Sequence, residues 1–176
     1  MKILMIEGSP HKNGTSNTLA AEFIKGAESA GHTVETVDAV RSKIGGCLGC
    51  NVCQTGAPCV QKDGMEEIIA KMRECDMLVL TTPMYYFGFS AQLKAVIDRF
   101  YPLGSGRMAG KKSALIVAQY NPDEAISESL KTAYKGIASY MGFEDKGIIV
   151  AAGCGSADDL RGTDLMKKAY DFGRSL

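Results

Sequence analysis

Short apolar runs alternate along the chain with longer stretches in which apolar residues recur every three or four positions. The short runs predict strands, and the spaced pattern predicts amphipathic helices. The predicted strands are residues 2–6, 33–37, 77–82, 113–119 and 147–152. Most of these runs are continuously apolar, which is typical of strands that are buried on both faces of a parallel sheet.

A helix is predicted after each of these strands. The third helix shows the spacing most clearly, because Leu93, Val96 and Ile97 fall on one face. Asp63 and Glu66 have the spacing of a capping box at the start of the second helix. The predicted helices are residues 18–30, 65–75, 91–101, 125–141 and 164–173.

This fivefold alternation of strand and helix predicts parallel strands joined by right-handed crossovers. The expected fold class is α/β, built as a three-layer α/β/α sandwich. No linker, repeat or low-complexity segment interrupts the sequence, so we expect one domain over residues 1–176.

The charge balance excludes some functions and leaves others open. Twenty basic and twenty acidic residues cancel, whereas nucleic-acid binders usually carry a basic excess. No apolar run approaches the roughly 20 residues of a membrane span, and no secretory signal is recognisable. We therefore expect a cytoplasmic protein with no nucleic-acid or membrane partner. Its six cysteines are then expected to be reduced thiols or metal ligands.

The segment GSPHKNGTSNT, residues 8–18, follows the first strand and leads into a helix. It carries hydroxyl groups, an amide and a lysine at the position where parallel sheets bind ligands. Backbone N–H groups at a helix start, together with hydroxyl donors, are typical of an anion site and suit a terminal phosphate. The alternative is an ordinary strand–helix loop with a hydroxyl cap. The glycine pattern at 153–158 follows the last strand and does not predict a dinucleotide site.

The loop after the third strand is rich in aromatic residues. Pro83 ends the strand, and Tyr85, Tyr86 and Phe87 follow before Gly88. Aromatic rings and backbone amides at this edge of a sheet suit a flat conjugated ring. The alternative is an aromatic cluster that packs against a helix or another subunit.

Four cysteines lie close together in CLGCNVCQTGAPC, at Cys47, Cys50, Cys53 and Cys59. A C-x₂-C-x₂-C run places three thiolates near enough to hold one iron–sulfur cluster. Structural zinc usually takes two separated pairs of cysteines, so the third cysteine fits zinc poorly. A loop without metal, or a thiol–disulfide pair, remains the other alternative.

Residues 8–18, 47–65 and 82–99, taken together and in this order, resemble the NADPH-dependent FMN reductase family of flavodoxin-like proteins. The cysteine segment resembles that of the iron–sulfur flavoprotein branch. The resemblance implies a five-stranded parallel sheet of order 2-1-3-4-5 and bound FMN. It also implies a homodimer or a dimer of dimers.

The resemblance assigns cofactor contacts by position. His11 departs from the family pattern, which commonly has an arginine there. The FMN phosphate would be held by Ser9, His11, Ser16, Asn17 and Thr18. The isoalloxazine ring would be lined by Pro83, Met84, Tyr85, Tyr86, Phe87 and Gly88, and further contacts would come from Gln119, Tyr120 and Asn121.

Two functions follow from the resemblance. The first is an FMN-dependent oxidoreductase that passes electrons from NAD(P)H to a small acceptor, such as a quinone, a nitro or azo compound, or free flavin. The second is an electron carrier fed by ferredoxin, in which the four cysteines hold a [4Fe–4S] cluster. No catalytic side chain is expected in either, because FMN carries the chemistry.

Overall fold

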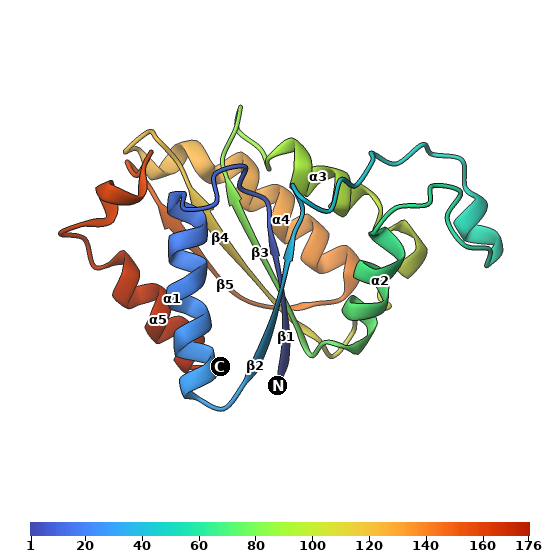
Figure 1. Cartoon of the computed structure of the whole chain (residues 1–176), viewed down its shortest axis with the longest axis horizontal. Coiled ribbons are helices and arrows are strands. Elements are labelled where there is room, and N and C mark those ends of the chain that lie inside the picture. Colours follow the sequence, from blue (N-terminus) through green and yellow to red (C-terminus); the bar gives the residue numbers. More distant parts are fainter.

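A five-stranded parallel sheet forms the centre of the computed structural model, which describes residues 1–176 (Figure 1). The strand order is β2-β1-β3-β4-β5, so the predicted fold class and the predicted order are both confirmed. The strands are β1 (Lys2–Glu7), β2 (Thr33–Asp38), β3 (Met77–Pro83), β4 (Lys112–Ala118) and β5 (Glu144–Ala151).

The central strands are buried on both faces because each face packs against its own apolar cluster. In β1, Ile3 and Met5 join one cluster, whereas Leu4 and Ile6 join the other. Successive side chains of a strand point to opposite faces, so a continuously apolar run serves both clusters at once. This explains why the apolar runs in the sequence do not alternate.

Helices cover both faces of the sheet and complete three layers. α1 and α5 pack side by side on one face, while α2, α3 and α4 lie on the other (Figure 1). No helix has both the length and the apolar character needed to cross a membrane. The α-helices are α1 (Thr15–Ser29), α2 (Met65–Glu74), α3 (Ala91–Asp98), α4 (Glu128–Met141) and α5 (Leu165–Arg174), and the 3₁₀ helices are η1 (Val52–Thr55), η2 (Tyr101–Leu103), η3 (Glu124–Ser127) and η4 (Ala157–Leu160).

Several local expectations differ from the structure. α1 begins at Thr15 rather than at residue 18, α3 ends at Asp98 rather than at residue 101, and α4 begins at Glu128, after a 3₁₀ turn, rather than at residue 125. β5 begins at Glu144 rather than at Gly147, and its register with β4 shifts between Ser113 and Leu115. The capping box is wrong as well. α2 has Gly64 at its N-cap position, with no side-chain cap. Asp63 precedes this position, and its Oδ2 atom pairs with Arg99 instead.

Two carboxylates lie side by side where β1 and β2 end. Glu7 is the register partner of Asp38. Burial raises the pKa of Glu7 above its ordinary value, and the charge of Asp38 raises it further, while Arg41 opposes both effects. Folding therefore shifts the protonation equilibrium of Glu7 toward the protonated form, relative to an ordinary glutamate.

The raised pKa of Glu7 predicts a pH-dependent effect on stability. An acid whose pKa is raised by folding contributes its stability fully below the unfolded-state pKa, and this stability is lost as pH rises through the folded-state pKa. At pH 7 the Glu7→Gln variant should therefore melt a few degrees higher than the wild type, and the difference should vanish near pH 3.5. Thermal unfolding followed by circular dichroism measures this.

Glu28→Gln is the matched control, because Glu28 is an exposed glutamate on α1. It should leave the melting temperature unchanged at both pH values. A Glu7→Gln variant that is less stable than the wild type at pH 7 would contradict the prediction.

Candidate functional site

The carboxyl ends of β1, β3, β4 and β5 border a cavity of about 570 Å³. The strand order reverses between β1 and β3, and such a switch point is where open parallel sheets bind ligands. The volume lies in the range of small-molecule and cofactor sites. The lining residues are Ser9, His11, Asn13, Gly14, Thr15, Ser16, Pro83, Met84, Tyr85, Ala118, Tyr120, Cys154, Gly155, Ser156 and Ala157.

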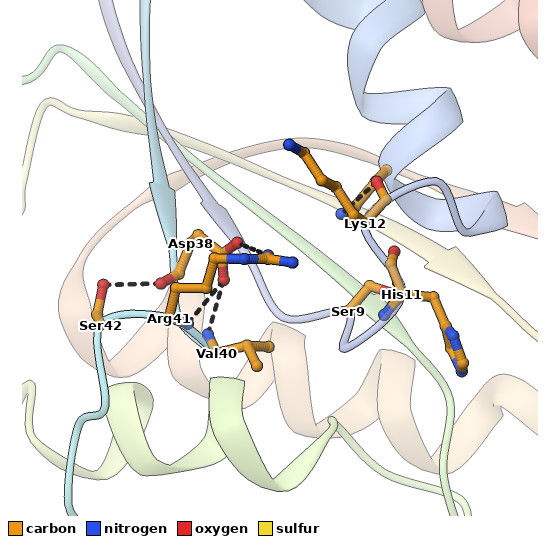
Figure 2. A network of polar contacts seen from close by, with 8 residues as sticks. Ser9, His11, Lys12, Asp38, Val40, Arg41 and Ser42 are labelled. Carbon is orange, nitrogen blue, oxygen red and sulfur yellow. Dashed lines mark hydrogen bonds and ion pairs between the residues drawn. The ribbon is translucent and has the colours of Figure 1, made fainter.

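The loop between β1 and α1 is held in shape by its own hydrogen bonds. The amide of Gly14 donates to the carbonyl of His11 over 2.9 Å, and the hydroxyl of Ser9 donates to the same carbonyl over 3.2 Å. Asn17 Nδ2 donates to the carbonyl of Lys12. The side chains of His11 and Lys12 extend from this closed loop in different directions, and His11 lies away from the Asp38–Arg41 pair (Figure 2).

The first turn of α1 carries buried polar atoms without a partner. Thr15 Oγ1, Ser16 Oγ and Asn17 Oδ1 are all buried and make no hydrogen bond. The helix starts after Gly14, which supplies no side-chain cap, and the first N–H groups of a helix have no partner within it. A buried polar group without a partner is costly, and the hydroxyls of Thr15 and Ser16 are each free to donate a hydrogen bond to a ligand, whereas Asn17 Oδ1 can only accept one. The helix dipole favours an anion at the same place.

The same loop packs against the start of α3. Ser90 Oγ donates to the carbonyl of Gly8 over 2.6 Å and accepts from the amide of Leu93 as the N-cap of α3. A Cβ atom on Gly8 would lie only 2.6 Å from Leu93 Cβ and 2.8 Å from Ser90 Oγ. Only glycine therefore allows the loop to approach the helix this closely.

The aromatic loop forms a tight hairpin whose tip is strained. The amide and carbonyl of Tyr85 pair with those of Gly88 over 3.1 Å, and Tyr86 and Phe87 both have positive φ, at 45° and 66°. Bulky residues rarely adopt this conformation, which costs on the order of 1–3 kcal/mol for each. Ser129 on α4 donates to the carbonyl of Phe87 over 2.6 Å and supports the tip. The hairpin thus holds aromatic side chains outward at a cost in free energy.

The loop after β4 is shaped by one buried amide. Gln119 Nε2 donates to the carbonyls of Asn121 and Asp123, both over 2.8 Å. Tyr120 is left exposed, and its ring lies so close to Gly155 that a Cβ atom there would meet it at 2.5 Å. Gln119 shapes the loop, and Tyr120 borders the cavity.

The structure brings half of the predicted cofactor residues to this cavity. Thr18 does not reach it, because its hydroxyl donates back to the carbonyl of Gly14. Tyr86 is fully exposed beyond the rim. The predicted residues on the lining are Ser9, His11, Ser16, Pro83, Met84, Tyr85 and Tyr120, and those outside it are Asn17, Thr18, Tyr86, Phe87, Gly88, Gln119 and Asn121.

Residues 154–157 border the cavity and were not predicted. They belong to the glycine pattern that fails as a dinucleotide fingerprint. The available signal was their position, since they follow the carboxyl end of a parallel strand. Burial raises the pKa of the Cys154 thiol and the charge of Asp159 raises it further, which disfavours the reactive thiolate form.

The four clustered cysteines border a second cavity, of about 600 Å³, that shares no lining residue with the first. The segment that carries them extends away from the sheet beside α2 and α3 (Figure 1). The structure contains no group of three or more cysteine, histidine or carboxylate side chains placed to hold a metal ion. The donor chemistry of the segment suits iron and sulfide, but its geometry in this conformation does not.

The predicted family can be tested against known proteins. The family model described as NADPH-dependent FMN reductase matches residues 1–143. An iron-sulfur flavoprotein of Archaeoglobus fulgidus is 31% identical over 181 residues, covering 100% of this chain and 79% of that protein. The iron-sulfur flavoprotein MJ1083 of Methanocaldococcus jannaschii is 36% identical over 106 residues, which are 60% of this chain but only 55% of that protein.

Solved structures show the same fold. The NAD(P)H:quinone oxidoreductase from Methanothermobacter marburgensis superposes with a TM-score of 0.78 at 20% identity, covering 99% of this chain and 95% of that one. The sheet order, the cavity at its switch point and these matches define a flavodoxin-like oxidoreductase of the FMN-dependent class. The chain belongs to the NADPH-dependent FMN reductase family.

The contact between Gly8 and α3 predicts the effect of a single methyl group. Gly8→Ala should destabilise the protein by about 1–3 kcal/mol, because the new Cβ would force the loop away from Leu93 and Ser90. Gly136→Ala is the control, since nothing lies within 4 Å of the corresponding Cβ position on α4. It should stabilise the helix by about 0.5–1 kcal/mol. Urea denaturation measures both, and equal effects of the two substitutions would contradict the analysis.

Proposed function

We propose that this protein binds FMN in the cavity at the switch point and passes electrons from NAD(P)H to a small acceptor. The acceptor class is a quinone, a nitro or azo compound, or free flavin. The buried, unpartnered hydroxyls of Thr15 and Ser16 carry the proposal, because they lie at the start of α1 where an anion is favoured. A phosphate monoester supplies acceptors for both hydroxyls and for the free N–H groups of the turn.

FMN fits the residues that are present. Its phosphate would lie against the β1–α1 loop, with Ser9, His11, Ser16, Asn17 and Thr18 as the proposed phosphate residues. Of these, Ser9 and Thr18 already use their hydroxyls within the loop and Asn17 Nδ2 donates to the carbonyl of Lys12, so the hydroxyl of Ser16 has the most capacity left to donate. The ring would lie toward β3 and β4, with Pro83, Met84, Tyr85, Tyr86, Phe87, Gly88, Gln119, Tyr120 and Asn121 as the proposed ring residues.

Bound FMN supplies the hydride and electron chemistry, and the chain supplies binding, orientation and access. The β1–α1 loop would hold the phosphate, and Tyr85 at the base of the hairpin would border the ring. Tyr120, packed on Gly155, borders it on the side of β4. We propose that these exposed aromatic side chains also pack against a second copy of the chain in a homodimer or a dimer of dimers.

A second candidate function is that of an iron–sulfur flavoprotein that exchanges electrons with ferredoxin. The observation that favours it is that Cys47, Cys50, Cys53 and Cys59 all border one cavity. In addition, the amide of Gly49 donates to Cys47 Sγ over 3.4 Å, as amides do to ligating sulfurs. Relatives named iron-sulfur flavoproteins support it as well. The thiols do not converge in this structure, so we derive no step through a cluster.

Protein purified without oxygen tests the proposed function directly. We expect one FMN per chain, bleaching of its visible absorption on addition of NADPH or NADH, and its return on addition of a quinone. No flavin after incubation with FMN would overturn the proposal. Flavin that neither nicotinamide reduces would reject the NAD(P)H-dependent enzyme in favour of the carrier. Iron and sulfide analysis of the same sample tests the second candidate, which requires near four irons per chain.

A single hydroxyl tests the phosphate site. Ser16→Ala should raise the FMN dissociation constant about 10- to 100-fold, because a hydrogen bond to a charged group is worth about 1.5–3 kcal/mol. Ser29→Ala is the matched control, since Ser29 lies at the other end of α1 and donates to the carbonyl of Gly26. Fluorescence titration with FMN measures both variants. An unchanged dissociation constant for Ser16→Ala would remove Ser16 from the site.

A further inference from the structure

Arg99 is a buried cation that the proposed flavin chemistry does not use. It is the C-cap residue of α3, only 3% of it is exposed, and it borders the cavity of the four cysteines. Burial of an arginine is costly unless its charge and its N–H groups are all partnered. The identity of its partners therefore indicates what it is for.

All side-chain partners of Arg99 lie near the two ends of one segment, residues 45–63, which carries the four cysteines and is called the cysteine segment below. Nη1 pairs with Asp63 Oδ2 and donates to the carbonyl of Gly45 over 3.3 Å. Nη2 donates to Cys59 Sγ over 3.3 Å. Asp63 Oδ2 also accepts from the amide of Gly45 over 3.1 Å. One guanidinium and one carboxylate thus join the start of the segment to its end.

Few other side-chain hydrogen bonds connect the cysteine segment to the rest of the protein. Gln61 Nε2 donates to the carbonyl of Gly46 over 2.9 Å and reinforces the junction of the two ends. Gln54 Nε2 donates to the carbonyl of Tyr101 over 3.0 Å, beyond the end of α3. Cys47 and Cys50 are exposed. Of the four cysteines, Cys59 is the one whose sulfur accepts a hydrogen bond from a buried side chain, that of Arg99.

α3 connects this junction to the flavin cavity. Ser90 at its N-terminal end bonds to Gly8 of the β1–α1 loop, and Arg99 at its C-terminal end bonds to the cysteine segment. The helix contains eight residues, which span about 12 Å at a rise of about 1.5 Å per residue. The two cavities are thus held at a defined separation.

We infer that Arg99 is the positioning residue of the cysteine segment, and that it fixes Cys59 as the thiol on which Cys47, Cys50 and Cys53 must converge for any shared chemistry. This goes beyond the proposed function, because it concerns the thiol segment and not the flavin cavity. It holds for metal binding and for thiol–disulfide exchange alike. The planar fork of an arginine can serve an aspartate, a carbonyl and a sulfur together, whereas the ammonium group of a lysine acts as a point charge.

The test uses two variants of Arg99 and a control from the same cavity. Arg99→Lys keeps the charge but not the fork, and the double variant Arg99→Gln with Asp63→Asn removes both charges, so that neither partner is left as an unpaired ion. Arg107→Lys is the control, because Arg107 borders the same cavity but is exposed. FMN content and melting temperature establish that each variant is folded.

The measurement is the rate of Cys59 labelling by a bulky maleimide divided by its rate with N-ethylmaleimide, resolved by peptide mass spectrometry. Both reagents react with the thiolate, so the fraction ionised cancels and the ratio reports access alone. Cys50 in the same molecules is the exposed reference. In wild type and in Arg107→Lys, the ratio at Cys59 should be well below that at Cys50.

In both Arg99 variants the Cys59 ratio should rise at least about threefold, toward the ratio at Cys50, as local opening of the segment becomes more frequent. Amide hydrogen exchange should rise between residues 45 and 63 and stay unchanged in β1, β3 and β4. A Cys59 ratio that stays at the wild-type value in both folded variants overturns the inference. So does an increase in exchange that extends equally to the central strands, because that pattern reports general destabilisation. Labelling is done on protein that iron analysis shows to be free of metal, because a cysteine bound to iron does not react with a maleimide. Neither outcome then depends on whether the protein oxidises NADPH.

Discussion

The contact between Gly8 and Ser90 is the constraint on which both cavities depend. It joins the end of β1 to the start of α3 through one hydrogen bond of 2.6 Å and a side-chain contact that leaves no room for a methyl group. It sets the path of the loop that begins α1, and therefore the position of the buried hydroxyls of its first turn. It also anchors the helix whose other end carries Arg99. A single close approach of backbone and helix thus relates the proposed anion site to the cysteine segment.

Much of the fold could be predicted because it depends on local pattern. Successive residues of β1, β3 and β4 pack into two different apolar clusters, so these strands are continuously apolar and can be recognised from the sequence. The lining of the cavity could be predicted where it depends on strand ends and on the start of a helix, as for Ser9, Ser16 and Tyr85. Prediction failed where distant residues decide the outcome. Asp63 has the spacing of a capping box, but Arg99, which lies 36 residues further along the chain, donates a hydrogen bond to Oδ2 of its carboxylate. The positive φ angles of Tyr86 and Phe87 run against the preferences of aromatic residues, so no local rule predicts them.

The two cavities differ in how firmly their lining residues are held by the rest of the protein. The cavity at the switch point is bordered by strand ends and a helix start, and its unpartnered hydroxyls are buried. The cysteine cavity has one fixed point, and most of its wall is a segment with few ties to the sheet. The Asp63 carboxylate belongs to that fixed point. Burial alone would raise its pKa, but the hydrogen bonds from Arg99, Gly45 and Met65 bring the pKa below its ordinary value. The junction is therefore charged and intact at neutral pH, while the thiols beyond it lie apart.

The shortness of α3 also limits how the protein can change over evolution. Each residue of an α-helix turns the chain by about 100°, so inserting or deleting one residue would swing Arg99 away from Asp63 while Ser90 stayed in place. Only a change of whole turns would preserve the facing of both ends, and that would alter their separation by about 5.4 Å per turn. The helix between the two cavities therefore tolerates a change of length poorly. Relatives that use both cavities together should therefore share the length of this helix even where their sequences have diverged.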